Sequence, residues 1–290
     1  MTITRFAPSP TGRLHLGHAY SAMLAHDHAR SRAGTFLLRI EDIDPGRSRT
    51  EHVAGILEDL DWLGLRHDGA VVFQSDRLPI YADALERLKR RGLAYPCFCT
   101  RSEIAAEVAA SASAPHGPDG PLYPGTCRRL DAQEVRRRMA MQPHAWRLDV
   151  GKALLSCSGK GPLAWSDNGA LVQARPEMFG DVVLARKDAP TSYHLAVTVD
   201  DAAQGVTDVV RGRDLYEATH VHRLLQALLN LPTPQYHHHG LLTDDAGRRL
   251  AKRNGAPTIA SLREAGVDPR ALVAGLRQGR LPVGYGAASA

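Results

Sequence analysis

Short apolar strands alternate with helices over the first third of the chain. Strands are expected where apolar and β-branched residues gather in short runs, and helices where apolar residues recur at helical spacing. These rules predict strands at residues 2–7, 35–40 and 71–73 and helices at residues 18–32, 50–63 and 79–91. Because each strand is followed by a helix that can return the chain to the same edge of a sheet, the pattern predicts an α/β fold with a parallel sheet.

The alternation stops near Tyr95. Residues 109–125 are rich in Ala, Ser, Gly and Pro and predict a surface loop, and regular signals stay weak to about Ser192. This middle part therefore has the character of an insertion between two halves of one sheet.

The alternation returns in the last third of the chain. Strands are expected at residues 206–211 and 235–239, and Asp214 is expected to cap a helix that begins at Leu215 and runs to about Asn230. A basic, glycine-containing loop follows at residues 243–254, and two short helices are expected at residues 261–265 and 269–278.

These signals predict a Rossmann-like, parallel-sheet catalytic domain divided by an inserted subdomain, with a short helical C-terminal part. The expected boundaries are residues 1–95 and 191–240 for the two halves of the catalytic domain, 96–190 for the insertion, and 241–290 for the basic loop and the helical part.

The composition is that of an ordinary globular protein, with 43% hydrophobic residues, 23% charged residues and a formal charge of +5 over 290 residues. The positive charge permits a polyanionic partner, although charge alone favours a solvated arginine-rich surface. The N-terminal residues contain no apolar run of a secretory signal, and no stretch reaches the length of a membrane span. We therefore expect a monomeric, cytoplasmic protein with no membrane partner.

The stretch His15-Leu16-Gly17-His18 stands at an expected helix start, after the first strand and a turn that contains two prolines. A helix N-terminus offers backbone N–H groups to phosphate, a glycine lets a nucleotide approach closely, and histidines can donate hydrogen bonds to phosphate oxygens. By itself this run is weak evidence, because histidines at a helix start are more often caps or surface residues.

A second candidate stretch, Arg249-Leu250-Ala251-Lys252-Arg253, lies in the basic loop. A mobile loop with a lysine can close on ATP and neutralise the leaving pyrophosphate. Taken alone, such a run is more simply explained as a solvated basic loop.

Together the two stretches resemble the signature motifs of class I aminoacyl-tRNA synthetases. His15 to His18 matches the HIGH motif, and Arg249 to Arg253 matches the KMSKS motif, with Arg249 in place of the first lysine, Ala251 in place of the serine, and Lys252 retained. The resemblance implies that His15, His18 and Lys252 are catalytic. It also implies an ATP site with Mg²⁺, made by His15, Gly17, His18, Asp214 and Lys252.

Four further stretches resemble the glutamyl- and glutaminyl-tRNA synthetases within this class. They recur in the family's order, and they are residues 5–12, 38–44, 193–196 followed by 199–201, and 206–212. The resemblance implies that glutamate is the amino acid and that it is bound by Arg5, Ala7, Ser9, Glu41, Tyr193 and Arg211.

The chemistry of these side chains fits glutamate, which has two carboxylates and one ammonium group. Arg5 and Arg211 can each hold a carboxylate with paired hydrogen bonds, and Glu41 can pair with the ammonium. Without the resemblance, a structural ion pair for Arg5 and Glu41 and core packing for Tyr193 are the simpler explanations. Which arginine holds which carboxylate stays open.

The chain resembles the short paralogues of the glutamyl-tRNA synthetase family. Only 37 residues follow Arg253, so an anticodon-binding domain is expected to be absent. Val197 stands where discriminating full-length members often have an amide side chain. The resemblance implies tRNA-independent activation of glutamate, followed by its transfer to the queuosine in the anticodon loop of tRNA(Asp). Arg136, Arg137 and Arg138 are a candidate RNA contact or, equally, a solvated helix face.

Two alternatives remain at this point. The chain can be a truncated glutamyl-tRNA synthetase that charges the 3′ end of tRNA(Glu), although Val197 and the short C-terminal part disfavour this. It can also be a catalytically silent RNA- or zinc-binding paralogue, which the altered Arg249 and Ala251 favour slightly.

Three cysteines, Cys97, Cys99 and Cys127, are expected to supply soft ligands for one structural Zn²⁺, and the alternative is that they are reduced cysteines packed in the core. The stretch from Tyr123 to Cys127 resembles a segment of the family in which the tyrosine is the fourth ligand, and His116 is the rival donor. The remaining Cys157 is expected to be structural. A further run, residues 237–239, contains three histidines, but neighbours in a strand point to opposite faces, which favours strand packing over a metal site.

Overall fold

The computed structural model describes the whole chain except residues 111–115, 119, 244–256 and 282–290. Two groups of strands form the central layer. Strands β1 (Ile3–Phe6), β2 (Thr35–Ile40) and β3 (Val72–Phe73) pair in parallel in the order β1-β2-β3. The second group has the order β11-β12-β8-β9, and its members are β11 (Asp208–Gly212), β12 (Gln235–His239), β8 (Ala164–Asp167) and β9 (Ala170–Gln173). The predicted parallel α/β sheet is therefore confirmed, and only β9 runs antiparallel to its neighbour.

The two groups of strands meet between β1 and β11. The backbone N–H of Thr207 donates to the carbonyl of Ile3 at 3.0 Å, and the N–H of Ile3 donates to the Thr207 hydroxyl at 2.8 Å. These bonds place the first strand of the chain beside a strand from its last third. Side chains at the carboxyl ends of β1 and β11 are thereby brought together.

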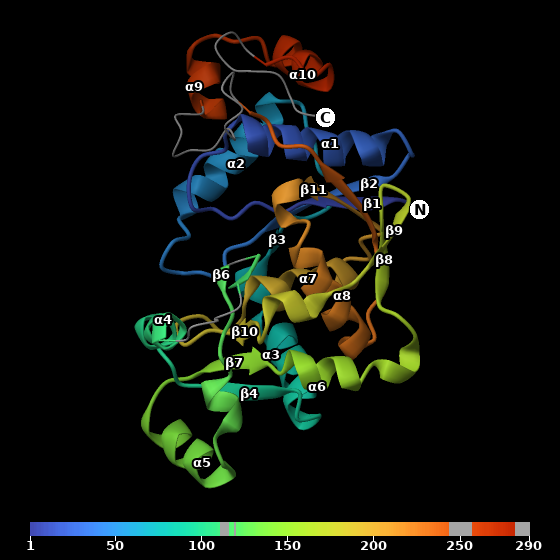
Figure 1. The fold of residues 1–290 in the computed structure, drawn as a ribbon. Helices are drawn as coiled ribbons and strands as arrows, with labels where there is room; N and C mark the ends of the chain where they lie inside the picture. The colour runs from blue at the N-terminus through green and yellow to red at the C-terminus, as the bar shows by residue number, and fades with distance from the viewer. Residues whose placement is uncertain (111–115, 119, 244–256, 282–290) are drawn as a thin grey trace.

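Helices cover both faces of the central layer (Figure 1). On one side lie α1 (Leu16–Arg30), α2 (Thr50–Trp62), α9 (Ile259–Glu264) and α10 (Pro269–Arg277), and on the other lie α3 (Leu78–Arg90), α7 (Tyr193–Ala203) and α8 (Ala218–Leu229). Alternation along β11 sends Val209 into the core with α7 and α8 and Val210 into the core with α1. The sheet is therefore buried on both faces, as parallel sheets are.

The residues between the two halves form a second, smaller set of elements. An antiparallel sheet has the order β10-β7-β4, from β4 (Ala94–Cys97), β7 (Ala145–Leu148) and β10 (Val183–Ala185). Around it lie α4 (Arg101–Ala110), β5 (His116–Gly117), β6 (Gly120–Pro121), α5 (Ala132–Met141) and α6 (Val150–Leu155). Most of these elements had no clear sequence signal, because strands of two to four residues are too short to show alternation.

One expected helix boundary is wrong. Asp214 was expected to cap a helix from Leu215, but Arg213–Leu215 form a 3₁₀ turn and α8 begins at Ala218, with Glu217 at the N-cap position. The predicted basic loop lies almost entirely outside the described residues. Within the described part of the chain, no helix is both long and apolar enough to cross a membrane.

Candidate active site

A cavity of about 510 Å³ opens at the carboxyl ends of β1, β11 and β12, beside the N-terminus of α1. This edge is where parallel α/β sheets bind their ligands. The cavity lining includes every residue predicted for glutamate or ATP that the structure describes: Arg5, Ala7, Ser9, His15, Gly17, His18, Glu41, Tyr193, Arg211 and Asp214. Lys252, the remaining predicted residue, lies outside the described residues.

His15 and His18 hold each other at the start of α1. The Nδ1 of His15 accepts from the Gly17 N–H at 3.1 Å, and the Nδ1 of His18 accepts from the His15 N–H at 3.3 Å. Their rings stack with centroids 3.8 Å apart. The two imidazoles are therefore fixed as a reciprocal cap at the positive end of the helix dipole, where an anion such as phosphate is favoured.

Arg5, at the centre of β1, is already paired within the fold. Its guanidinium donates from Nε to Oδ1 of Asp201 at 3.0 Å, and only 4% of Arg5 is exposed. Asp201 also pairs with Arg39 at 2.9 Å. Burial by itself would raise the pKa of Asp201, but the two arginines outweigh it and lower the pKa, so the carboxylate is ionised.

A second buried carboxylate, Asp200, supports this arrangement from behind. It accepts from Tyr81 and Arg77 at 2.7 Å each and from Gln74 at 2.8 Å. All of these partners come from the segment between β3 and the middle of α3. Asp200 therefore anchors α7, the helix that carries both Tyr193 and Asp201, against that segment.

Glu41 follows β2 and lies 3.6 Å from Arg39, with 10% of its side chain exposed. Burial raises the pKa of Glu41 from its ordinary value to about 7, although Arg39 and Arg5 act in the opposite direction. Because burial makes Glu41 costly to ionise, an added cation, such as the ammonium group of an amino acid, would stabilise its charged form.

Arg211, on β11, has a different environment from Arg5. Its guanidinium donates to Thr219 Oγ1 at 2.7 Å, to His238 Nε2 at 3.1 Å, to the Leu215 carbonyl at 3.1 Å and to the Tyr193 hydroxyl at 3.3 Å. Among the described residues, no carboxylate forms a salt bridge with Arg211. This buried cation is thus available to a carboxylate that the ligand brings.

The histidines around Arg211 stay neutral. Burial and the nearby Arg211 together lower the pKa of His238 to about 4, although Asp167, in contact at 2.8 Å, acts in the opposite direction. Burial and Arg211 also lower the pKa of His222, whose Nδ1 lies 3.5 Å from the guanidinium. Neutral imidazoles can accept hydrogen bonds from Arg211 without cancelling its charge.

Three sequence-based candidates lie at the margins of the cavity or outside it. Ser9 and Asp214 are exposed at its rim. Val197, one turn after Tyr193 on α7, is 1% exposed and does not belong to the lining. Its influence on a ligand therefore has to act through packing around Tyr193.

The sequence reasoning missed part of the lining on α1 and β12. Ser21 and His239 face each other at 3.0 Å, and Tyr20 packs edge-on against His239 with ring centroids 5.2 Å apart. All three line the cavity. The signal was present in the helical spacing, because Gly17 and Tyr20–Ser21 share the helix face that turns to the sheet. The remaining missed lining residues are Phe6, Pro8, Thr11, Gly12, Arg13, Val210, Gly212, Leu215, Gly240, Leu241 and Leu242.

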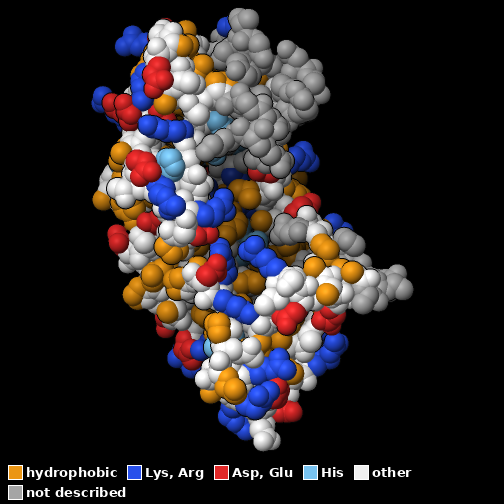
Figure 2. All heavy atoms as spheres, turned by 90° about the vertical axis from the view of Figure 1, so that its left-hand side faces the viewer, with side chains coloured by type: hydrophobic (Ala, Val, Ile, Leu, Met, Phe, Trp, Pro, Cys, Tyr) orange, Lys and Arg blue, Asp and Glu red, His pale blue; other side chains and the backbone are white. Residues whose placement is uncertain are grey.

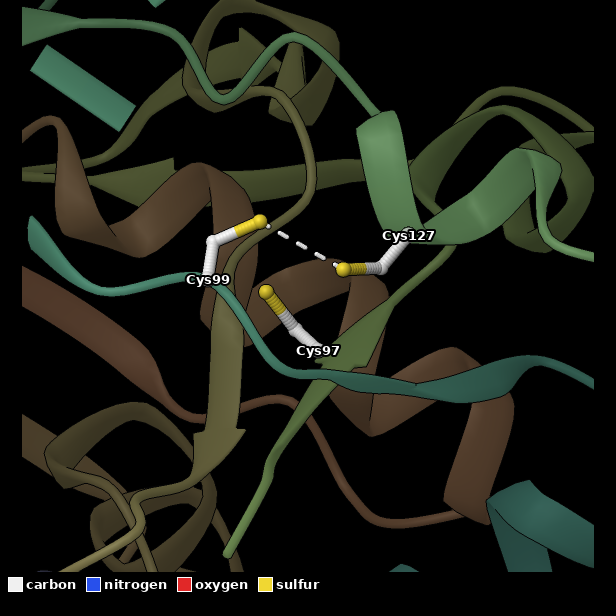
Figure 3. A group of neighbouring side chains, drawn as sticks. All are labelled: Cys97, Cys99 and Cys127. Atoms are coloured by element: carbon white, nitrogen blue, oxygen red, sulfur yellow. Dashed lines mark hydrogen bonds between the residues drawn. The ribbon is translucent and has the colours of Figure 1, made fainter. Parts of the chain in front are cut away.

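The predicted zinc ligands come together at a second place. The sulfurs of Cys97, Cys99 and Cys127 lie within 4.8 Å of one another, from the end of β4 and a short 3₁₀ turn (Figure 3). Cys99 Sγ is 3.4 Å from Cys127 Sγ and 3.5 Å from the Tyr123 hydroxyl. Ligands of a tetrahedral zinc–thiolate site lie ~3.8 Å apart, so this donor set fits the ion with little movement. The side chain of the rival donor, His116, lies outside what the structure describes.

The arginine-rich helix α5 lies at the far end of the molecule from α10 (Figure 1). Figure 2 shows Lys and Arg side chains on this lower part of the molecule, interspersed with acidic and hydrophobic ones. Two of the three predicted contacts are already paired, because Arg137 and Arg138 bond to Glu134 at 2.7 and 2.6 Å. Both remain partly exposed, and Arg136 is exposed.

Comparison with known proteins gives a consistent set of relatives. The family described as tRNA synthetases class I (E and Q), catalytic domain, matches residues 1–285. A Glutamyl-Q tRNA(Asp) synthetase of Rhodobacter capsulatus is 54% identical over 278 residues, covering 92% of this chain and 96% of that protein. One of Symbiobacterium thermophilum is 44% identical, with coverage of 94% and 84%.

Solved structures of longer proteins share the fold. A glutamate tRNA ligase from Elizabethkingia meningosepticum, in complex with its amino acid, superposes with a TM-score of 0.79 and 26% identity. The match covers 96% of this chain but 60% of that one, so the chain spans about three-fifths of the ligase.

Proposed function

The chain belongs to the catalytic-domain family of class I tRNA synthetases for glutamate and glutamine, and on this premise we propose a two-step reaction. In the first step, ATP and glutamate form glutamyl-adenylate without tRNA. In the second, a hydroxyl of the queuosine in the anticodon of tRNA(Asp) takes the glutamyl group, and AMP leaves. The observation that carries the proposal is a cavity that joins Arg211, a buried arginine with no carboxylate partner among the described residues, to a histidine-capped helix N-terminus.

Activation needs the α-carboxylate of glutamate to attack the α-phosphorus of ATP, with pyrophosphate leaving. Negative charge that builds on the phosphate oxygens is stabilised by His15, His18 and the start of α1. Lys252 is proposed to neutralise the leaving group, and Gly17 and Asp214 to complete the ATP site. A Mg²⁺ ion bound with ATP would supply further charge neutralisation.

Glutamate is proposed to lie between Arg211 and Glu41. The guanidinium of Arg211 binds one carboxylate of the amino acid, with the Tyr193 hydroxyl 3.3 Å away as a second donor. Glu41 receives the ammonium group, and Ala7 and Ser9 form the neighbouring wall. Arg5 adds positive charge toward the other carboxylate, from a side chain that Asp201 holds in place.

The proposed acceptor rests on the relatives that cover nearly the whole chain, because these are Glutamyl-Q tRNA(Asp) synthetases. The exposed Arg136 and its neighbours on α5 are proposed to contact the anticodon loop. Similarity to glutamate tRNA ligases keeps one alternative, charging of the 3′ end of tRNA(Glu). A catalytically silent paralogue is the other alternative.

We also propose that Cys97, Cys99, Tyr123 and Cys127 hold one structural Zn²⁺ in the subdomain inserted at residues 96–190. The packing of Cys97, Phe98 and Cys127 as a separate small core supports a stabilising role for the ion. The predicted division into residues 1–95, 191–240 and 241–290, the monomeric state and the cytoplasmic location stay predictions.

The first step is tested by exchange of labelled pyrophosphate into ATP in the absence of tRNA. Exchange is expected with glutamate and not with aspartate, and it is expected to be lost in Lys252→Ala. Lys152→Ala, an exposed lysine on α6, is the matched control and should exchange normally. Absence of exchange at high glutamate would overturn the proposal in favour of a silent paralogue, and exchange that requires tRNA(Glu) would favour the truncated synthetase.

The second step is tested with tRNA(Asp) from which the 3′-terminal adenosine has been removed. Labelled glutamate should still be transferred to this RNA when it contains queuosine, and not when it has guanosine in that position. Transfer only to RNA with an intact 3′ end would contradict the anticodon as the site of attachment.

A further inference from the structure

Three metal-ligating side chains meet at the edge of the sheet opposite the cavity. They are His28 near the end of α1, Asp208 at the start of β11 and His237 in β12. Oδ1 of Asp208 lies 3.0 Å from Nε2 of His28 and 2.9 Å from Nε2 of His237. The cavity is lined instead from the other end of β11, at Gly212. The cluster is thus separate from the active site and from the cysteine cluster.

We propose that His28, Asp208 and His237 form a second metal site, which binds a divalent transition ion of the Zn²⁺ type.

The ligand atoms are already spaced for such an ion. All three lie within 4.8 Å of one another, and the two imidazole rings are tilted with centroids 4.3 Å apart. Nitrogen and oxygen ligands at ~2.0–2.1 Å from a tetrahedral zinc lie about 3.3 Å apart. The two nitrogen–oxygen distances to Asp208, 3.0 and 2.9 Å, are a few tenths of an ångström shorter than this, so the side chains would have to move apart slightly around an ion.

The second oxygen of the carboxylate is held from outside the cluster. Oδ2 of Asp208 accepts from the Thr207 hydroxyl at 2.7 Å, and that hydroxyl also accepts from the N–H of Ile3. Orientation of a ligand by an outer hydrogen bond is a usual feature of metal sites, and here it keeps Oδ1 turned to the histidines.

The donor set selects the class of ion. Two imidazoles with one carboxylate suit Zn²⁺, Co²⁺ or Ni²⁺ better than Mg²⁺ or Ca²⁺, which prefer oxygen ligands. Only the carboxylate is charged when both rings are neutral, so a divalent ion leaves a net positive site with room for water as a further ligand. The side chains are 13%, 15% and 25% exposed in the order His28, Asp208, His237, so an ion can enter from solvent.

Strand alternation explains how a run of three histidines contributes to this site. His238 turns to Arg211 and Asp167, whereas His237 and His239 turn to α1, where they meet His28 and Ser21. The sequence favoured strand packing for the whole run, and the proposed site departs from that expectation for His237 alone. The other two ligands come from elements distant in sequence.

The experiment uses the full chain with its cysteine cluster first loaded with Zn²⁺, followed by titration with Co²⁺. Cobalt bound to nitrogen and oxygen ligands gives visible d–d absorption without the near-ultraviolet bands of a cobalt–thiolate bond. We expect one further equivalent of Co²⁺ with this spectrum. His28→Gln, which keeps a donor to Asp208, should weaken binding by at least ~10-fold. The matched control is His26→Gln, because His26 lies on the same helix but outside the cluster and pairs with Asp27.

The outcomes separate the proposal from its competitors. Equal Co²⁺ affinity in the wild type, His28→Gln and His237→Asn would overturn it, as would thiolate bands during the titration. A purely structural hydrogen-bonded cluster would leave the wild type unable to bind the ion, which would also overturn it. Loss of binding in both variants, with unchanged thermal midpoints before metal addition, would establish the site.

Discussion

Two buried arginines of one cavity have opposite environments. Arg5 is paired with Asp201, which also binds Arg39, so the positive charge of β1 is balanced inside the fold. Arg211 is as deeply buried, at 5% exposed against 4%, yet its described neighbours are a tyrosine, a threonine, neutral histidines and a carbonyl.

The difference indicates separate tasks for the two side chains. A buried cation without a carboxylate partner lowers the stability of the fold, and the cost is recovered when a ligand carboxylate arrives. Arg5 gains less from the ligand, because its charge is already satisfied. We therefore expect Arg211 to dominate the binding of glutamate. The paired group of Arg5, Asp201 and Arg39 is expected to fix the shape of the pocket.

The largest effect on activity is expected for Arg211→Met. Loss of a buried, charge-assisted contact costs about 2–5 kcal/mol, which lowers kcat/KM for glutamate in pyrophosphate exchange by roughly 30-fold to several thousand-fold. KM for ATP should change little. Arg213→Met is the matched control, because Arg213 is the exposed residue two positions further along the chain. Similar losses of kcat/KM for glutamate in Arg211→Met and Arg5→Met would contradict separate tasks for the two arginines.

The next effect concerns folding, and it is expected for Asp201→Asn. The substitution leaves Arg5 and Arg39 without their shared ionised partner, which should lower the free energy of unfolding by about 3–5 kcal/mol. Urea denaturation measures this loss, with Asp83→Asn, an exposed residue of α3, as the control. Arg211→Met should be the less destabilising of the two site variants, and the reverse order would contradict the division of tasks.

The sequence was sufficient for the elements that carry strong local signals. The strand at residues 35–40 and the strand at residues 235–239 were predicted at their observed bounds, because each is a compact run between turn residues. The site residues were found through resemblance to a family. Spacing alone left Arg5, Glu41 and Tyr193 open to simpler structural explanations.

The pairing pattern within the site was not predictable from spacing. Asp201 was visible only as part of a matched stretch, and nothing local says that it joins Arg5 and Arg39, from two other elements. The same holds for His28 and His237, which are far apart in sequence and meet through parallel pairing of β11 and β12 beneath α1. Such contacts depend on register and helix packing, which residue patterns specify weakly.

The smallest expected effect is a change in the pH dependence of stability. It concerns Glu41, which lies beside the paired arginines Arg5 and Arg39. Burial raises the pKa of Glu41 from 4.5 to about 7 in the folded protein. Between these values the folded state binds more protons than the unfolded state, so the contribution of Glu41 to stability is fully present below pH 4.5 and is lost as the pH rises through about 7. Glu41→Gln lacks this titration.

Urea denaturation at a series of pH values should therefore show the wild type losing stability relative to Glu41→Gln as the pH increases across that window. Bound glutamate brings an ammonium group, which favours ionised Glu41 and should flatten the wild-type dependence. A difference between the two proteins that stays constant with pH would mean that Arg39 and Arg5 keep Glu41 ionised throughout. Glu41 would then belong to a fully paired network with Arg39 and Arg5. Its attraction for the ammonium group of glutamate would be weaker than its burial implies.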